Sequence, residues 1–403
     1  MKKSYVFLQG VRSPFFRRLG ATLRVHGNDV LKINFNVGDT LSWSTGNSIS
    51  YRGEMGRLSD FYADVFKRYG VTDVVLFGDC RPVHRPAIIL AQSMGVRIHV
   101  YEEGYFRPSW ITLERDGVNG NSRLSKDPNW YRVQAESIPS YGNGVPFESP
   151  FIVRASHDVM YNIGAGLNPV LYPGYSSHVP YSPISEYLNY IRRSARVALR
   201  SKRDRIIVND LIGGSQFNPF YLLPLQLQSD AQIRHHSGFG DIESVISYVV
   251  ESFANHAPDL SKLLIKNHPL DPGFCDYDRF IRRMEKDYHL EGRLEYIESG
   301  HLPSLLSSAS GVVTVNSTVG GSALVHNRPT IALGRAVYDL PGLTFQSGLD
   351  FFWTEALAPD RELFRAFRNV VIHQTQVNGG FYCRPGINLA VANSLPSLIG
   401  HDS

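Results

Sequence analysis

The sequence predicts an α/β protein with two Rossmann-like domains that face a cleft. Short apolar stretches alternate with amphipathic stretches of helical length in both halves of the chain. The 403 residues exceed what one hydrophobic core ordinarily organises. Polar residues and glycines directly follow several apolar stretches, which is where open α/β sheets bind ligands. We expect domains at 1–200 and 205–375, and a C-terminal segment at 376–403 that packs back on the first domain.

The composition is that of an ordinary globular protein. Hydrophobic residues make up 43% and charged residues 19%, and the formal net charge of +4 is too small by itself to indicate nucleic acid. Cys80, Cys275 and Cys383 form no CxxC pair, so we expect neither a zinc site nor a disulfide framework, which favours a reducing compartment. No apolar stretch reaches the roughly 18 residues that span a bilayer, and the N-terminal apolar run is too short for a signal peptide. We therefore expect a cytoplasmic protein that can touch a membrane surface.

The first half contains four expected strands, at 5–9, 30–35, 73–79 and 97–101. Gly95 ends an expected helix at 86–94 between the last two. This order is typical of βαβ units and predicts a parallel, doubly wound sheet. The loop after the first strand lacks the GxGxxG pattern. Its Arg12 either faces a ligand or is solvated, as most lone loop arginines are.

Two adjacent carboxylates, Glu102 and Glu103, end the fourth strand and are followed by Gly104. Neighbouring side chains of a strand point to opposite faces, so only one of the two can enter a given cleft. That one could act as a general base towards a hydroxyl group. A solvated acidic turn paired with Arg107 is the structural alternative, and the residues alone do not decide between them.

Residues 130–205 are rich in tyrosine and proline and end in a basic stretch. The spacing at 185–202 is helical, and the stretch includes Arg192, Arg193, Arg196 and Arg200. A basic amphipathic helix beside aromatic residues is typical of contact with an anionic lipid surface, where each cation contributes about 1 kcal/mol. A solvated helix face or an inter-domain linker has the same composition. We place the domain boundary at the end of this region.

The second half continues the alternation. Strands are expected at 205–210, 220–230, 263–265, 294–297, 311–315 and 329–334, with helices at 243–254, 277–287 and 388–398. The run at 220–230 ends on polar residues, which places Asp230 at a strand end.

Two strand ends in the second half suit a phosphate. Lys-Asn-His-Pro follows the strand at 263–265, and the proline stiffens the backbone after the histidine. Asn-Ser-Thr follows the strand at 311–315 and predicts a capped helix, whose first turn has free N–H groups and a favourable dipole. A surface turn with a solvated histidine would explain the first stretch alone, but the two together predict a nucleotide pocket. The candidate nucleotide-binding residues are Lys266, His268, Pro269, Asn316, Ser317 and Thr318.

Four motifs in this order resemble the capsule polysaccharide biosynthesis family of bacterial β-Kdo transferases, and its KpsS type in particular. They are Glu102-Glu103-Gly104, the run at 224–230 that ends in Asp230, Lys266-Asn267-His268-Pro269, and Asn316-Ser317-Thr318-Val319. The resemblance covers most of the chain. The acidic and His-Pro motifs are also similar to those of bacterial sialyltransferases, which use another CMP-ulosonic acid.

The resemblance implies a GT-B glycosyltransferase that moves Kdo from CMP-β-Kdo to a phosphatidylglycerol-type lipid at the inner face of the inner membrane. This transfer starts the β-Kdo linker of a capsular polysaccharide. It retains configuration, which calls for two displacements or a front-side reaction. By position in the family motif, Asp230 is expected to be the nucleophile and Glu102 or Glu103 the base. Arg12, Arg107 or Arg234 is expected to bind the carboxylate of Kdo.

No cofactor and no metal are expected, because no D-x-D pair follows a strand and a CMP donor has a single phosphate to neutralise. The expected partners are the CMP-sugar, the lipid acceptor and possible capsule assembly proteins, with no nucleic acid. Two alternatives stay open. One is a transferase that uses another CMP-ulosonic acid, such as CMP-sialic acid, or a UDP-sugar. The other is a non-catalytic scaffold of capsule export that has kept a nucleotide-binding fold.

Overall fold

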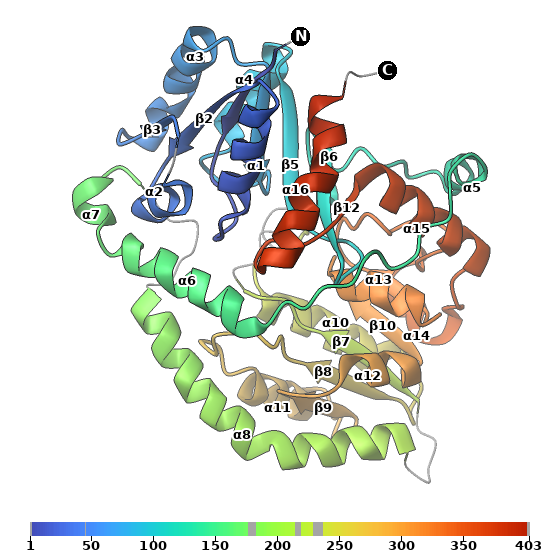
Figure 1. Cartoon of the computed structure of the whole chain (residues 1–403). Coiled ribbons are helices and arrows are strands. Elements are labelled where there is room, and N and C mark those ends of the chain that lie inside the picture. The colour runs from blue at the N-terminus through green and yellow to red at the C-terminus, as the bar shows by residue number, and fades with distance from the viewer. Residues whose placement is uncertain (1, 45, 176–182, 214–218, 229–236, 401–403) are drawn as a thin grey trace. The chain divides into compact units, whose positions relative to one another are not determined.

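The computed structural model describes residues 2–44, 46–175, 183–213, 219–228 and 237–400. The chain divides into two compact units. Unit 1 comprises Met1–Arg123, Pro139–His178 and Val371–Ser403, and unit 2 comprises Leu124–Ile138 and Val179–Val370. Each unit is built on one sheet with helices on both faces (Figure 1). The predicted α/β class, with two Rossmann-like sheets, is confirmed.

Unit 1 contains a seven-stranded sheet with the order β12-β6-β5-β4-β1-β2-β3. Five strands are parallel, and β6 pairs antiparallel with both β5 and β12. The strands are β1 Ser4–Phe7, β2 Asp29–Asn34, β3 Ser48–Ser50, β4 Asp73–Phe77, β5 Arg97–Glu103, β6 Trp110–Arg115 and β12 Gln376–Asn378. The antiparallel additions β6 and β12 are absent from the sequence prediction.

Two helical layers cover the sheet of unit 1. Helices α1 (Phe15–Val25) and α16 (Arg384–Ile399) share one hydrophobic cluster with the sheet, and α3 (Leu58–Arg68) and α4 (Arg85–Ser93) share the other. The C-terminal helix is tied to the first strand because Lys3 Nζ and Tyr5 Oη both donate to the carbonyl of Leu398, at 2.7 Å each. The other helices of unit 1 are α2 (Val37–Trp43), α6 (Phe151–Ala165) and α7 (Asn168–Leu171).

Unit 2 contains a five-stranded, fully parallel sheet with the order β11-β10-β7-β8-β9. The strands are β7 Phe220–Pro224, β8 Lys262–Lys266, β9 Leu294–Ile297, β10 Gly311–Thr314 and β11 Thr330–Ala332. Helices α10 (Ile242–His256), α11 (Tyr277–Asp287) and α14 (Leu349–Glu355) pack on one face. Helices α8 (Pro183–Gly213), α12 (Leu302–Ser308) and α13 (Thr318–Val325) pack on the other. Helix α5 (Pro128–Glu136) also belongs to unit 2, and α15 (Arg361–Thr375) begins in unit 2 and has its last residues, from Val371, in unit 1.

One predicted strand is wrong. Residues 205–210 belong to α8, a helix of 31 residues assigned to unit 2. The β-branched run Ile206-Ile207-Val208 has the composition of a strand, but neither glycine nor proline interrupts the chain between Ser185 and Ile212. Ile207, Val208 and Leu211 have helical spacing and pack against the core. Tertiary packing therefore overrides the local strand preference.

Candidate functional site

The strand order of unit 2 locates its ligand-binding edge. Along the chain, the sheet grows from β7 through β8 to β9 on one side, and then from β10 to β11 on the other. This is the order of a Rossmann fold, and its direction reverses between β7 and β10. Ligands of such sheets bind outside the carboxyl ends of the strands at that reversal.

Gln226 and Asn316 join the two strand ends at this reversal point. Gln226 Nε2 donates to Asn316 Oδ1 at 3.0 Å, and the backbone N–H of Asn316 donates to Gln226 Oε1 at 3.3 Å. Both side chains are buried. The pair fixes the spacing of the carboxyl ends of β7 and β10. Sequence reasoning assigned Asn316 to the nucleotide site and missed this function of Gln226, because the pairing of β7 with β10 spans 90 residues.

Ser317 and Thr318 form the start of α13, as predicted. Ser317 Oγ accepts a hydrogen bond from the N–H of Val319 at 3.2 Å and so caps the helix. The small residue Gly320 has a packing function, because a Cβ there would lie 2.2 Å from Tyr338 Oη. The same tyrosine donates to the carbonyl of Ser317 at 2.5 Å. Tyr338 therefore fixes the first turn of α13.

His268 has a defined ring orientation. The N–H of Leu270 donates to its Nδ1 at 3.1 Å, and its own N–H donates to Asn267 Oδ1 at 2.8 Å. Because Nδ1 accepts, the proton of the neutral ring is carried by Nε2. Pro269 is exposed on the turn that follows. This tautomer makes Nε2–H a donor suited to a phosphate oxygen.

Lys266, one of the predicted nucleotide-binding residues, is buried. Its Nζ donates to the carbonyl of Asn267 at 3.3 Å. Burial, followed by the positive charge of Arg193, lowers the pKa of the ammonium group, while Asp204 and Glu298 oppose this shift. Lys266 is thus one charge of a buried cluster beside the turn.

Arg193 organises the turn that carries His268. Its guanidinium donates to the carbonyls of His268, Pro269 and Asp271 at 2.9, 2.8 and 2.6 Å. It also pairs with Glu298 through Nε and a terminal nitrogen, both at 3.1 Å. The expected lipid-facing role of Arg193 is corrected by this burial, because the side chain exposes only 6% of its surface.

The other arginines of α8 differ in exposure. Arg192 is exposed and Arg196 half-buried, so both remain candidates for contact with an anionic surface. Arg200 pairs with Asp278 at 2.9 Å and is less available. Two predicted site residues, Asp230 and Arg234, lie outside the described residues.

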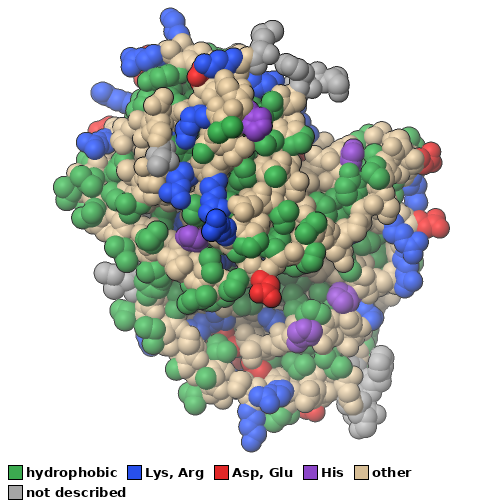
Figure 2. All heavy atoms as spheres, in the orientation of Figure 1, with side chains coloured by type: hydrophobic (Ala, Val, Ile, Leu, Met, Phe, Trp, Pro, Cys, Tyr) green, Lys and Arg blue, Asp and Glu red, His purple; other side chains and the backbone are tan. Residues whose placement is uncertain are grey.

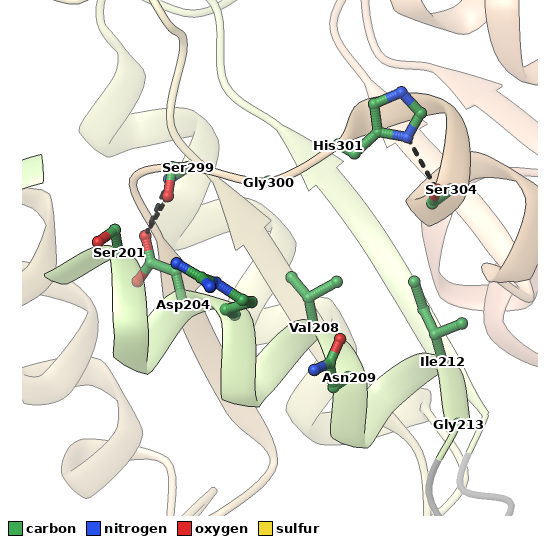
Figure 3. A pocket seen from close by; sticks show the side chains of 11 residues that line it. Ser201, Asp204, Val208, Asn209, Ile212, Gly213, Ser299, Gly300, His301 and Ser304 are labelled. Atoms are coloured by element: carbon green, nitrogen blue, oxygen red, sulfur yellow. Dashed lines mark hydrogen bonds between the residues drawn. The ribbon is translucent and has the colours of Figure 1, made fainter. Parts of the chain in front are cut away.

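Asp204 of α8 fixes the carboxyl end of β9. One carboxylate oxygen accepts from the N–H of Glu298 at 3.0 Å, and from the N–H and hydroxyl of Ser299 at 2.9 and 3.0 Å. Asp204 and Ser299 line a pocket of about 770 Å³ between α8 and the start of α12, and Figure 3 shows the hydrogen bonds that join them. Asp204 therefore attaches α8 to the carboxyl end of β9. Glu298, which pairs with Arg193, lies at this same strand end.

Unit 1 repeats the Rossmann order in β3-β2-β1-β4-β5, with its reversal between β1 and β4. Arg81 lies there, and one of its terminal nitrogens donates to Gln9 Oε1 and to the carbonyl of Gly10, both at 3.1 Å. Burial lowers the pKa of Arg81, while Tyr161 and Glu102 oppose the shift. Sequence reasoning missed Arg81 because nothing in its local sequence distinguishes it from a loop arginine.

Glu102 and Glu103 end β5 with their side chains on opposite faces. A Cβ at Gly78 would lie 3.3 Å from Glu102 Oε2, so this carboxylate lies over the loop after β4, near Arg81. Glu103 Oε1 accepts from Tyr382 Oη at 3.2 Å and pairs with Arg154 of α6 at 3.8 Å. Burial and then the charge of Glu103 raise the pKa of Tyr382. The opposite directions agree with strand alternation, so the two glutamates cannot act at the same point.

The two described arginine candidates for a sugar carboxylate have different environments. Arg12 pairs with Asp158 of α6 and lies over the ring of Tyr161, 4.9 Å from its centroid. Arg107 is exposed, and its Nε donates to the carbonyl of Gly104 at 3.3 Å. Arg12 is therefore held by a carboxylate, whereas Arg107 is tied only to its own turn among the contacts described here.

The described part of the chain contains neither a metal-ion cluster nor a membrane-spanning helix. No three His, Cys, Asp or Glu side chains converge there in a way that could hold a metal ion. Within the same residues, no helix is both long and apolar enough to cross a membrane.

The fold defines the class of protein, one with two Rossmann-like α/β units in a single chain. Residues 72–382 match the family described as "Capsule polysaccharide biosynthesis protein". The chain is 35% identical to the capsule polysaccharide export protein KpsS of Escherichia coli, over 94% of this chain and 97% of that protein. It is also 35% identical to the capsule polysaccharide modification protein LipB of Neisseria meningitidis serogroup B, over 94% of this chain and 92% of that protein. The chain belongs to the capsule polysaccharide biosynthesis family.

A solved structure, the β-Kdo 2,7 transferase KpsC of Thermosulfurimonas dismutans, aligns with 98% of this chain and 100% of its own. The identity is 13% and the TM-score 0.44. A TM-score this low supports no argument about function.

Proposed function

We propose that this protein is a metal-independent, retaining glycosyltransferase of capsule synthesis with a GT-B arrangement. It moves Kdo from CMP-β-Kdo to a phosphatidylglycerol-type lipid and so starts the β-Kdo linker. Family membership supports the capsule context, since the two relatives are described as capsule modification and export proteins. The observation that carries the proposal is the ligand-binding edge of unit 2, where His268 and the start of α13 follow two strands of a Rossmann sheet.

In the proposed donor complex, unit 2 binds the CMP phosphate through hydrogen-bond donors. His268 Nε2–H is one donor, and the first turn of α13 adds backbone N–H groups and the positive end of the helix dipole, although the N–H groups of Val319 and Gly320 already donate to Ser317. Each charge-assisted contact is worth about 1.5–3 kcal/mol. Arg193 acts indirectly by holding the turn that carries His268. The leaving group is a phosphate monoester, which needs charge stabilisation and no protonation.

The proposed reaction has two displacements. Asp230, assigned by its motif position, attacks the anomeric carbon as the bond to the CMP phosphate breaks. The acceptor hydroxyl then attacks the glycosyl-enzyme, its proton passes to a glutamate, and Asp230 leaves as a carboxylate. We favour Glu102 as the base. The reason is that Glu103 is held by Arg154 and Tyr382, whereas Glu102 faces the reversal point of unit 1.

A lipid acceptor would bring the protein to the inner face of the inner membrane as a peripheral protein, close to other capsule assembly proteins. Of the arginines of α8 that were predicted to face lipid, Arg192 and Arg196 suit an anionic lipid surface in this setting.

The experiment combines purified protein, CMP-Kdo made in situ and a soluble phosphatidylglycerol analogue, with products detected by mass spectrometry. We expect one added Kdo, in equal amounts with and without EDTA. Asp230→Ala should give no product, whereas the matched Asp259→Ala, which removes an exposed carboxylate, should be as active as wild type.

Parallel reactions with CMP-sialic acid and a UDP-sugar test the other donors, and product from either would replace Kdo in the proposal. CMP binding without any product would refute the lipid-initiating reaction. Absence of both CMP binding and product would favour the scaffold of capsule export.

A further inference from the structure

Helix α6 has its polar side directed into unit 1. Arg154 pairs with Glu103 at 3.8 Å and lies over the ring of Tyr382, and Asp158 pairs with Arg12. Tyr161 Oη accepts from Asn36 Nδ2 at 2.7 Å and donates to Asp39 Oδ1 at 3.2 Å. These contacts fix the rotation of α6 about its axis, with its charged and hydrogen-bonding side chains at the carboxyl edge of the β1–β5 sheet.

The opposite side of α6 is apolar and exposed. Ile152, Met160 and Ile163 expose 72%, 61% and 72% of their surface. Their spacing keeps them on one side of the helix, and α7 continues the exposed apolar surface. We call this surface the α6–α7 apolar row. Its exposed members are Phe151, Ile152, Val159, Met160, Ile163, Leu167, Val170 and Leu171.

This arrangement is the reverse of an ordinary surface helix, which buries its apolar side and exposes its polar one. Contiguous exposed apolar surface of this kind marks a binding face for a protein or a membrane. Figure 2 shows hydrophobic side chains gathered along the course that α6 and α7 take in Figure 1, with Lys and Arg side chains beside them.

The charges around the row suit an anionic surface. Residues 151–171 contain one carboxylate, Asp158, which pairs with Arg12. The exposed Arg52 lies over the ring of Tyr172, which directly follows α7, 5.7 Å from the ring centroid. An apolar row with few carboxylates and an arginine beside it is the pattern of a helix that lies in the interface of a bilayer with anionic lipids.

We propose that the α6–α7 apolar row inserts into the headgroup and acyl boundary of an anionic bilayer, with α6 parallel to the membrane plane. The described helices include none that could cross a membrane, and α6, with 15 residues, is too short to do so. Because Asp158 is on the other side of α6, the inserted helix holds Arg12, a candidate for binding the sugar carboxylate, just above the lipid headgroups. This link to the sugar rests on the proposed function, whereas the lipid contact does not.

The test is flotation of the full chain with vesicles of mixed phosphatidylglycerol and phosphatidylethanolamine, and with phosphatidylcholine vesicles. We expect binding to the anionic vesicles, weakened by salt. Ile163→Glu and Met160→Glu should each weaken it roughly tenfold or more, because a carboxylate then enters the apolar and anionic boundary. The matched control is Leu357→Glu, which replaces a side chain exposing 84% of its surface outside α6, α7 and α8 and should bind as wild type does.

Several outcomes would overturn the proposal. Equal loss of binding in Leu357→Glu would show nonspecific charge repulsion. A wild-type dimer that Ile163→Glu makes monomeric, without a change in flotation, would identify a second copy of the chain as the occupant. A lower melting temperature in Ile163→Glu, again with unchanged flotation, would mean that the rest of the chain covers the row. The row variants should still transfer Kdo to the soluble acceptor. If the wild-type protein transfers no Kdo, that result counts only against the proposed function.

Discussion

Replacement of Arg193 by alanine tests whether this side chain holds the turn that carries His268. The guanidinium makes five hydrogen bonds, three to turn carbonyls and two to Glu298, and both charged side chains are almost fully buried. The variant leaves Glu298 with two neutral donors, Asn267 Nδ2 at 3.0 Å and Tyr296 Oη at 3.1 Å. Breaking a buried ion pair from one side costs about 3–5 kcal/mol, because the remaining charge is uncompensated. We expect a loss of stability in this range and not the sum of five separate bonds.

The assay is urea unfolding followed by tryptophan fluorescence, with Trp353 as the buried reporter in the core of unit 2. The neighbouring residue supplies the control. Arg192 is exposed, so Arg192→Ala should change stability by less than about 0.5 kcal/mol.

CMP binding provides a second readout. Without urea, where Arg193→Ala is still folded, the affinity of this variant for CMP should fall because the turn that carries His268 is no longer held. The double variant Arg193→Met with Glu298→Gln should recover stability, since it removes both charges. Equal stabilities of the Arg193 and Arg192 variants, within 1 kcal/mol by this test, would refute the reasoning.

Three further predictions concern other sites. His268→Asn keeps a side-chain acceptor near the Leu270 N–H but removes Nε2–H, so CMP affinity measured calorimetrically should fall by about 1.5–3 kcal/mol with unchanged unfolding. Gln226→Leu leaves the polar atoms of buried Asn316 without this partner and should cost about 1–3 kcal/mol in urea unfolding; an unchanged midpoint would contradict the pairing. Burial raises the pKa of Glu114 from 4.5 to about 7, so the folded state holds a proton that the unfolded chain releases, and stability falls as pH rises through this window. Glu114→Gln should therefore be more stable than wild type by about 3 kcal/mol above pH 7, and this difference should shrink towards pH 5. A difference that does not change with pH would argue against the raised pKa of Glu114 as its cause.

Local pattern was sufficient for many elements of the fold. The apolar runs ending at Phe77, Ile265 and Thr314 form strands, and Ser317 caps the helix that its residue type predicted. These features depend on neighbours within a few residues. The order of the strands does not, and it is what identifies the reversal points between β1 and β4 and between β7 and β10.

The errors have long-range causes. Ile207 and Val208 have the preferences of a strand, yet they pack as part of a helix against a core that includes residues about 100 positions away. Strand β12 is only three residues long and pairs with β6 across more than 260 positions, so no local alternation indicates it. Arg193 stands among exposed basic residues in the sequence, and only the fold separates it from Arg192. Its buried partner Glu298 is 105 residues away.

The two sheets share a strand order but differ in the chemistry at their reversal points. Unit 1 presents the carboxylate of Glu102 beside half-buried Arg81, whereas unit 2 presents hydrogen-bond donors from His268 and the first turn of α13. Under the proposed function, the base for a hydroxyl acceptor and the donors for a phosphate leaving group would belong to different units. If so, the functions should separate by mutation. His268→Asn should lose CMP affinity and keep vesicle binding, whereas Ile163→Glu should do the reverse. Loss of both functions in either variant would mean that the two units do not act independently in binding.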